Sequence, residues 1–330
     1  MAGRRTNLAL LLAFSAAFIS GWAAFGVGNG WNAWVSIGHG VAGLVIIVLI
    51  PWKAIVVRRG LARRRAGKGP SVALILLSAF AIVSGVLHAT GLVTRVGPVS
   101  GMQLHVGTAI AAVPLLLWHV RKRPARFHRA DLSRRSMLRA GAVLASSAGV
   151  YLVSEAIVRA TSLPGARRRF TGSYERGTNT PENMPVTQWL TDSVPRLDSE
   201  SWRVAVAGAW FGRDELDDYG DTIRAVLDCT GGWFAAQEWT GVWVRRLLPE
   251  AAGRSIVVRS VTGYERVFPA ADAGHLLLAT RAGGAPLSYG HGFPARLVAP
   301  GRRGFWWVKW VASIEPTDRP WWLQPPFPPS

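Results

Sequence analysis

The sequence predicts a multi-domain protein in which an α-helical transmembrane bundle, four helices plus a fifth anchor helix, precedes an α+β or mainly β domain. Five apolar stretches of membrane length fill the first half, and basic residues cluster between them. Short β-rich runs separated by Gly and Pro fill the second half. We therefore divide the chain into residues 1–130, a membrane domain, residues 131–165, a signal-like segment with the fifth helix, and residues 166–330, an extracytoplasmic domain.

The apolar stretches each approach the roughly 20 residues that cross a bilayer core. They run at about 7–25, 34–51, 71–92, 102–119 and 137–157. The net charge is +19, and its distribution is uneven: residues 1–159 hold 19 basic and 2 acidic side chains, whereas residues 160–330 hold 19 and 17. The excess lies in short loops beside the apolar stretches, which the positive-inside rule places in the cytoplasm. We expect a multi-pass plasma-membrane protein whose partner is the lipid bilayer and not nucleic acid, with a cytoplasmic amino terminus and an extracytoplasmic carboxy-terminal domain.

The fifth apolar stretch follows a twin-arginine pattern, Ser133-Arg134-Arg135-Ser136-Met137-Leu138-Arg139. Such signals direct the export of folded domains. An ordinary basic flank before a transmembrane helix is the alternative, and both interpretations place the following domain outside. No clear A-x-A cleavage site follows, so we expect the segment to remain as an anchor.

The membrane half contains an internal repeat. Ile19-Ser20-Gly21 matches Val83-Ser84-Gly85, and His39 followed after twelve residues by Trp52-Lys53 matches His105 followed after twelve residues by Trp118-His119. Two histidines at one depth on facing helices are what a b-type haem needs for its axial nitrogens. We expect His39 and His105 to bind the haem iron, with His88 and His119 as alternative ligands. A purely structural role within the bundle is the other interpretation. The histidine-bearing layout over residues 7–125 resembles small bacterial membrane b-type cytochromes.

Cys229 is the lone cysteine of the chain. A single sulfur excludes an intrachain disulfide, a CxxC zinc site, a c-type haem attachment and an iron–sulfur cluster held by this chain. An inert buried thiol, a nucleophile and a one-thiolate metal ligand remain.

The sequence around this cysteine is similar to the molybdopterin-binding domain of the sulfite oxidase family. The resemblance covers about residues 170–315 and rests on Leu227–Trp233, on Trp239-Thr240-Gly241-Val242, on the run from His291 to Gly301 (HGFPARLVAPG), and on Val308-Lys309-Trp310. The opening run Phe170–Glu175 fits the start of that domain in bacterial members, which include a methionine sulfoxide reductase catalytic subunit.

This resemblance implies an enzyme, a molybdopterin-dependent oxidoreductase that transfers oxygen atoms. It implies Cys229 as the catalytic molybdenum ligand, since a thiolate suits a high-valent soft metal site. It also implies a set of molybdopterin-binding residues, which are Thr171, Tyr174, Glu175, Ser260, His291, Arg296, Trp307, Val308 and Lys309. Arg302 and Arg303 are further candidates for the pterin phosphate, with a solvated surface role as the alternative.

Together these features predict a membrane-anchored enzyme that exchanges electrons between the quinone pool, a b haem and a molybdenum–pterin centre. We expect it to reduce S- or N-oxides, whether small molecules or protein-bound. A sulfite-type dehydrogenase that passes electrons to the membrane haem is the second hypothesis. A haem protein whose outer domain has lost its metal is the third.

Overall fold

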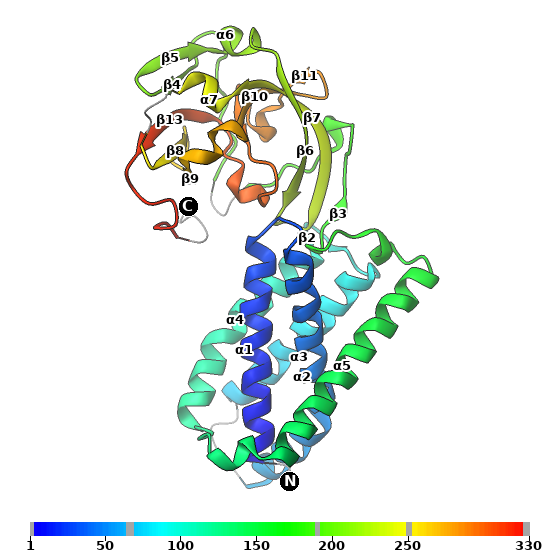
Figure 1. The fold of residues 1–330 in the computed structure, drawn as a ribbon. Helices are drawn as coiled ribbons and strands as arrows, with labels where there is room; N and C mark the ends of the chain where they lie inside the picture. Colours follow the sequence, from blue (N-terminus) through cyan, green and yellow to red (C-terminus); the bar gives the residue numbers. More distant parts are fainter. Residues whose placement is uncertain (1–2, 64–68, 189–191, 249–252, 326–330) are drawn as a thin grey trace. The chain divides into compact units, whose positions relative to one another are not determined.

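The computed structural model describes residues 3–63, 69–188, 192–248 and 253–325 and divides into two compact units. The helical unit comprises residues 1–25 and 30–172, and the sheet unit comprises residues 26–29 and 173–330. Figure 1 shows the helices of the first unit and the strands of the second.

Five long helices form the helical unit, and each is long and apolar enough, by length and composition, to cross a membrane. They are α1 Arg4–Gly26, α2 Asn32–Arg63, α3 Gly69–Thr90, α4 Gly101–Lys122 and α5 Arg134–Ala160. Two 3-10 turns, Arg129–Leu132 and Pro164–Arg167, lie on either side of α5. The helices extend beyond the apolar stretches seen in the sequence, because α2 continues through Pro51 and α5 begins within its basic flank.

The segment between α3 and α4 is a short hairpin of β1 Arg95–Val96 and β2 Val99–Ser100. Gly91 has φ +77° and closes α3, since its N–H donates to His88 O. Such a left-handed residue favours glycine. Ser100 begins α4 with a capping box, in which its Oγ accepts from the Gln103 N–H and its own N–H donates to Gln103 Oε1.

The helical unit buries few of its large apolar side chains. A small cluster packs inside it, consisting of Leu10, Ala13, Val45, Ile46 and Leu49. Outward-facing residues such as Leu12, Leu76 and Leu152 are 64% to 67% exposed. Helices that carry apolar side chains all round are typical of a lipid environment.

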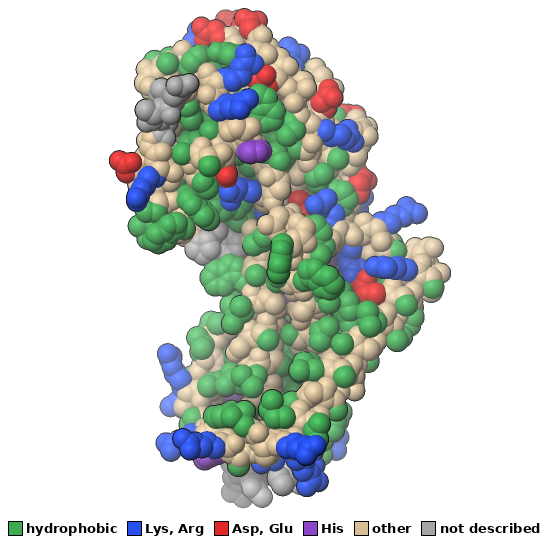
Figure 2. Space-filling model, in the orientation of Figure 1, with side chains coloured by type: hydrophobic (Ala, Val, Ile, Leu, Met, Phe, Trp, Pro, Cys, Tyr) green, Lys and Arg blue, Asp and Glu red, His purple; other side chains and the backbone are tan. Residues whose placement is uncertain are grey.

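Basic side chains gather at one end of the helical unit, as Figure 2 shows. There Arg4 forms two hydrogen bonds of 2.6 Å with the Asp131 carboxylate, which also accepts the His128 N–H. This ion pair joins the start of α1 to the turn before α5.

The sheet unit contains two sheets and short helical turns. The six-stranded sheet has the order β11-β10-β7-β3, with β12 beside β10 and β6 beside β7, and the five-stranded sheet has the order β5-β4-β13-β8-β9. The strands are β3 Tyr174–Glu175, β4 Arg203–Val206, β5 Ala209–Gly212, β6 Asp221–Cys229, β7 Trp233–Trp243, β8 Ser255–Ser260, β9 Glu265–Pro269, β10 Leu277–Ala282, β11 Ala285–Pro286, β12 Arg296–Val298 and β13 Val311–Thr317. The described helices are α6 Arg213–Asp217 and α7 Val244–Leu247, with 3-10 turns at Pro181–Asn183, Ala270–Gly274, Tyr289–His291 and Gly304–Trp306.

The sequence predicts short β-rich runs over residues 202–206, 255–261 and 275–280, and these overlap β4, β8 and β10. The sequence also predicts a helical stretch over residues 241–248, and the structure confirms it for only half of these residues. β7 continues to Trp243, which pairs with Leu277 of β10, and only Val244–Leu247 form one turn of helix. Pairing with a central strand outweighs the local helical pattern.

Candidate molybdenum and pterin site

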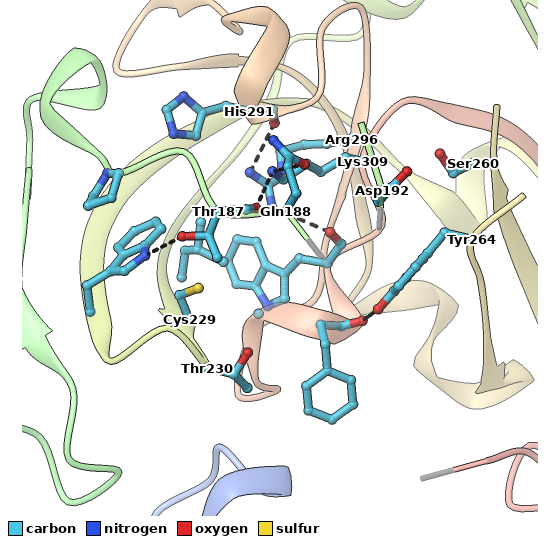
Figure 3. A pocket seen from close by; sticks show the side chains of 16 residues that line it. Thr187, Gln188, Asp192, Cys229, Thr230, Ser260, Tyr264, His291, Arg296 and Lys309 are labelled. Carbon is cyan, nitrogen blue, oxygen red and sulfur yellow. Dashed lines mark hydrogen bonds between the residues drawn. The ribbon is translucent and has the colours of Figure 1, made fainter. Parts of the chain in front are cut away.

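One cavity of the sheet unit contains the lone cysteine (Figure 3). It holds about 650 Å³ of space, including space open to solvent. Its lining comes from the ends of β6, β7, β8 and β12 and from the loops near them: Pro185, Thr187, Gln188, Asp192, Leu227, Cys229, Thr230, Trp233, Ser260, Tyr264, His291, Arg296, Gly304, Phe305, Trp307 and Lys309.

Cys229 is the last residue of β6 and pairs with Trp233, the first residue of β7. The turn between them closes through the Gly232 N–H, which donates to Cys229 O, and Gly232 has φ +87°. The Gly231 N–H donates to Cys229 Sγ over 3.3 Å. The two glycines thus let the backbone fold back over the thiol.

The thiol of Cys229 is buried, and burial and the neighbouring polar groups shift its pKa in opposite directions. Burial raises the pKa of Cys229 above its ordinary value. The Gly231 N–H, Thr187 and the cations Arg303 and Lys309 act in the opposite direction but do not reverse the shift. The free thiol is therefore neutral near pH 7, and a bound metal cation would be needed to stabilise the thiolate.

A buried ion pair lies behind Cys229. Arg303 pairs with Asp228, the residue before the cysteine, and its Nη2 donates to Cys229 O over 3.3 Å. Ser173 Oγ donates to Asp228 Oδ1 over 2.7 Å. Arg303 is fully buried, so the surface role considered for it is wrong. Its guanidinium fixes the end of β6, and Asp228 balances its charge.

Gly304 allows this loop to approach the cysteine. A Cβ at Gly304 would lie 3.1 Å from Cys229 Cα and 3.3 Å from Asp228 O. Asp228 and Arg303 also form an isolated parallel bridge. The loop after β12 therefore packs directly on the end of β6 because residue 304 has no side chain.

The HGFPAR motif forms a turn that brings its histidine and arginine to the same cavity. Gly292 has φ +108°, and a Cβ there would lie 2.9 Å from Arg296 Cβ. Arg296 Nη1 donates to His291 O over 3.1 Å, and His291 Nδ1 lies 2.8 Å from Ser288 Oγ. The arginine also lies over the rings of Trp239 and Trp307, at 5.2 and 5.6 Å from their centroids.

These groups are basic and incompletely solvated. Burial lowers the pKa of Arg296 to about 9, and burial together with the Arg296 charge lowers the pKa of Lys309 to about 7. Burial, then Arg296 and Lys309, lowers the pKa of His291 to about 4. When the pKa values of cationic side chains are lowered in this way, an anion that enters the cavity stabilises their charged forms.

Lys309 connects the cavity to a segment far away in the sequence. Its Nζ donates to Thr187 O, Gly290 O and Gln188 Oε1, at 2.9, 2.7 and 3.3 Å. Thr187 Oγ1 in turn accepts the Trp233 Nε1–H over 3.0 Å. Lysine and tryptophan thus position Thr187 beside the thiol.

The predicted cofactor residues separate into two groups. Cys229, Ser260, His291, Arg296, Trp307 and Lys309 line the cavity. Val308 is buried behind the wall, where its carbonyl accepts the Leu297 N–H over 2.7 Å. Thr171, Tyr174 and Glu175 are not in the cavity lining. Tyr174 and Glu175 form β3 beside the start of β7, and Glu175 Oε1 accepts the Thr178 N–H.

Several lining residues were not predicted from the sequence. Thr187, Gln188 and Asp192 lie in an irregular segment with no motif. Tyr264 lies at the turn between β8 and β9, and its hydroxyl donates to Phe305 O. Burial raises the pKa of this hydroxyl, so it is a hydrogen-bond donor throughout the physiological range. A short Gly-Tyr turn before a strand was the only sequence signal for Tyr264.

The residues present fit a molybdenum–pterin group with an anionic dithiolene and phosphate. A single thiol faces a cavity that Arg296 and Lys309 line together with one carboxylate, Asp192. Arg296 Nε is buried and has no acceptor among the described residues. Within those residues no three His, Cys, Asp or Glu side chains gather as a metal site. Cys229 would bind the metal, and Arg296, Lys309 and His291 would hold the anionic parts.

The helical unit holds the four predicted haem-ligand candidates. The rings of His39 and His105 lie 5.7 Å apart, centroid to centroid. His88 is buried near the end of α3, and its Nε2 lies 2.8 Å from Gly172 O. His119 lies in the last turn of α4 and is not in this pair.

Comparison with known families identifies the class of the domain. The family model for the oxidoreductase molybdopterin binding domain matches residues 191–322. The match contains Cys229, His291, Arg296 and Lys309. Residues 191–322 thus form a molybdopterin-binding oxidoreductase domain of the sulfite oxidase type.

Individual relatives cover part of the chain. Mitochondrial sulfite oxidase of Homo sapiens is 27% identical over 169 residues, and the match covers 38% of this chain and 31% of that protein. The crystal structure of the sulfane dehydrogenase SoxCD from Paracoccus pantotrophus is 24% identical, with a TM-score of 0.36, and the match covers 38% of this chain and 40% of that one. A TM-score this low does not establish a shared overall fold. The chain spans about a third of the length of the human enzyme it matches.

We expect the cofactor-free protein to alkylate slowly at Cys229. Because the pKa of the thiol is raised, the rate with iodoacetamide should still be rising at the pH where the rate of an ordinary cysteine, with a pKa of ~8.5, levels off. Mass spectrometry of the full chain in detergent follows the single cysteine without ambiguity. A rate that levels off near pH 8 would contradict the proposed environment, and a free thiol peptide added to the sample serves as the control.

We expect Arg296→Met to separate cofactor binding from stability. A charge-assisted hydrogen bond contributes about 1.5–3 kcal/mol, so cofactor affinity should fall by roughly 10- to 150-fold. The cofactor-free protein should lose less than about 1 kcal/mol of stability, because the buried guanidinium is replaced by an apolar side chain of similar length. Pterin content and thermal unfolding of the full chain measure the two effects.

Arg281→Met is the matched control for this experiment. Arg281 lies on β10 and pairs with Asp217 at the surface, where its side chain is 38% exposed. The control should retain the cofactor. Equal cofactor content in both variants would show that Arg296 does not hold the pterin.

Proposed function

We propose that this chain is a membrane-anchored, molybdenum-dependent oxidoreductase that exchanges electrons with the quinone pool through a b haem and reduces S- or N-oxides. The helical unit would lie in the plasma membrane with the amino terminus in the cytoplasm, and the sheet unit would lie outside. The observation that carries the enzymatic part is the Cys229 thiol in a cavity with Arg296, Lys309 and His291. Bound molybdenum would supply two-electron oxygen-atom transfer.

Two observations support the membrane cytochrome part of the proposal. Five helices among the described residues have the length and composition of membrane spans. His39 and His105, which are equivalent in the internal repeat, lie with their rings 5.7 Å apart. Two imidazoles that bind a metal through nitrogens ~2 Å from it would have centroids ~6 Å apart, so the spacing suits a shared iron. A haem would supply one-electron transfer there.

The proposed reaction balances without a further oxidant or reductant. A quinol gives up two electrons and two protons, and an S-oxide takes up two electrons and two protons to give the sulfide and water. Thr187, Tyr264 and Asp192 line the cavity near the thiol and are candidates to orient the oxide. The Tyr264 hydroxyl remains protonated near pH 7 and donates to Phe305 O, so it would have to give up this acceptor before it could donate to an oxide oxygen.

A sulfite-type dehydrogenase is the second candidate function. The 27% identity to a sulfite oxidase favours it, and cations around the cavity suit an anionic substrate as well as an anionic cofactor. The two functions use the same metal ligand and differ in the direction of electron flow.

Cys229→Ser should abolish turnover that depends on molybdenum. Serine replaces a soft thiolate by a hard oxygen, so the rate of oxide reduction should fall by more than about 100-fold. Haem absorbance should stay unchanged, because the substitution does not alter the helical unit. Thr230→Ser at the next position is the control and should remain active. If the Cys229→Ser protein retained activity, Cys229 would not be the metal ligand.

Anaerobic mixing of the purified, cofactor-replete full chain distinguishes the two functions. Methionine sulfoxide should reoxidise a dithionite-reduced haem band if the chain is a reductase. Sulfite should reduce the oxidised band if it is a dehydrogenase. We expect the first result, and it should be lost in the Cys229→Ser protein. Haem reduction by sulfite, without reoxidation by the sulfoxide, would show that electrons flow from the substrate to the haem, opposite to the proposed direction.

A further inference from the structure

The two histidines of the membrane repeat make matching backbone contacts in each half of the helical unit, and His39 Nδ1 also lies 3.5 Å from Ser20 Oγ. His39 Nδ1 lies 2.8 Å from Ala17 O on α1, and His105 Nδ1 lies 2.8 Å from Ala81 O on α3. A carbonyl oxygen can only accept, so in the neutral imidazole Nδ1 carries the proton in both contacts. Nε2 of each ring is then the nitrogen with a free electron pair, which is the form that binds a metal.

A glycine follows each of these carbonyl residues by one helical turn. A Cβ at Gly21 would lie 2.8 Å from His39 Cε1, and a Cβ at Gly85 would lie 2.8 Å from His105 Nδ1. Both distances are too short for a real side chain, so glycine lets each imidazole lie directly on the neighbouring helix. The repeat found in the sequence, Ile19-Ser20-Gly21 and Val83-Ser84-Gly85, therefore has a physical meaning.

We name Ala17 with Gly21, and Ala81 with Gly85, the two positioning pairs. In each pair the carbonyl fixes the ring nitrogen that does not bind metal, and the glycine fixes how closely the ring approaches the helix. The two constraints together set the orientation of the ring plane. The resulting planes of His39 and His105 are inclined at 77°.

We propose that the two positioning pairs are a duplicated device that holds the axial imidazoles of the haem in crossed planes. The inference rests on the proposed haem site. It adds that Ala17, Gly21, Ala81 and Gly85 act as positioning residues, which do not touch the iron. Crossed axial imidazoles leave the two iron orbitals that interact with the rings nearly equal in energy, whereas parallel imidazoles split them. The oxidised low-spin haem should then give a large-gmax, highly anisotropic electron paramagnetic resonance (EPR) signal.

His88 does not share this arrangement. Its Nε2 lies 2.8 Å from Gly172 O. In His88 the backbone contact is therefore made by Nε2, whereas in His39 and His105 it is made by Nδ1. Coordination through Nε2 of His88 would require breaking this bond. The two positioning pairs thus favour His39 and His105 over His88 as the ligands.

The experiment compares Gly21→Ala and Gly85→Ala with two control variants in the full chain, purified in mild detergent. Gly38→Ala and Gly107→Ala are the controls: Gly38 precedes His39 on α2, Gly107 lies near His105 on α4, and a Cβ at either position meets no atom within 4 Å. Haem content, the EPR spectrum and the haem midpoint potential are the readouts. None of them requires turnover.

We expect the unmutated protein and both controls to show the large-gmax signal. Each positioning variant should bind haem about 10-fold or more weakly, as is usual when a group that orients a metal ligand is disturbed. Any haem that remains should have an altered EPR spectrum and a shifted midpoint potential. The two variants should respond similarly, because the two pairs are equivalent.

Two results would overturn the inference while the haem proposal stands. One is a rhombic EPR signal of parallel imidazoles in the unmutated protein, which requires no variant to fold. The other is a spectrum and potential of Gly21→Ala and Gly85→Ala identical to those of the controls. A protein that takes up no haem on reconstitution, with the sheet unit still loaded with molybdenum, would overturn the proposed haem site as well, so the two failures are distinguishable.

Discussion

The buried ion pair between Asp228 and Arg303 is the constraint on which the molybdenum site depends. Both side chains are almost fully buried, and Ser173 and the Cys229 carbonyl form further hydrogen bonds with them. A buried pair of this kind contributes little net stability, but removal of one partner costs about 3–5 kcal/mol. Its effect is geometric, since it fixes the end of β6 and with it the direction of the Cys229 thiol. It also neutralises Arg303, so that this cation does not compete for an anionic ligand.

The remaining cations explain why the cavity suits an anionic cofactor. Arg296 and Lys309 have lowered pKa values because burial disfavours their charged forms. The thiol has a raised pKa for the same reason. A ligand that carries a metal cation to the thiol and negative charge to the two cations relieves all three shifts at once. Burying these groups costs free energy, and cofactor binding offsets that cost. Binding of the cofactor is therefore linked to the stability of the fold.

The sequence predicted the parts of the structure that depend on local pattern. The apolar stretches became five helices, and the HGFPAR motif brought His291 and Arg296 to one cavity with Cys229. It did not predict the residues that reach the cavity by chain topology alone. Thr187 and Asp192 lie in an irregular segment, and Lys309 positions Thr187 through a contact between distant parts of the chain. Arg303 was predicted either to contact the pterin phosphate or to be solvated at the surface, because nothing local indicates that residue 303 pairs with Asp228 inside the domain. Residues 241–243 were expected in a helix from their local sequence, because the residues of β10 that pair with them lie far away in the sequence.

The two units use one physical device at both proposed metal sites. In the sheet unit, Gly231 carries no side chain and its N–H contacts the thiol. In the helical unit, Gly21 and Gly85 carry none, and carbonyls one turn earlier accept from the imidazoles. Backbone groups are fixed by secondary structure, so they orient a ligand without the loss of side-chain entropy that another side chain would incur. Glycine beside a proposed metal ligand therefore has a specific role in this chain: it allows the backbone to approach closely the thiol or imidazole that it orients.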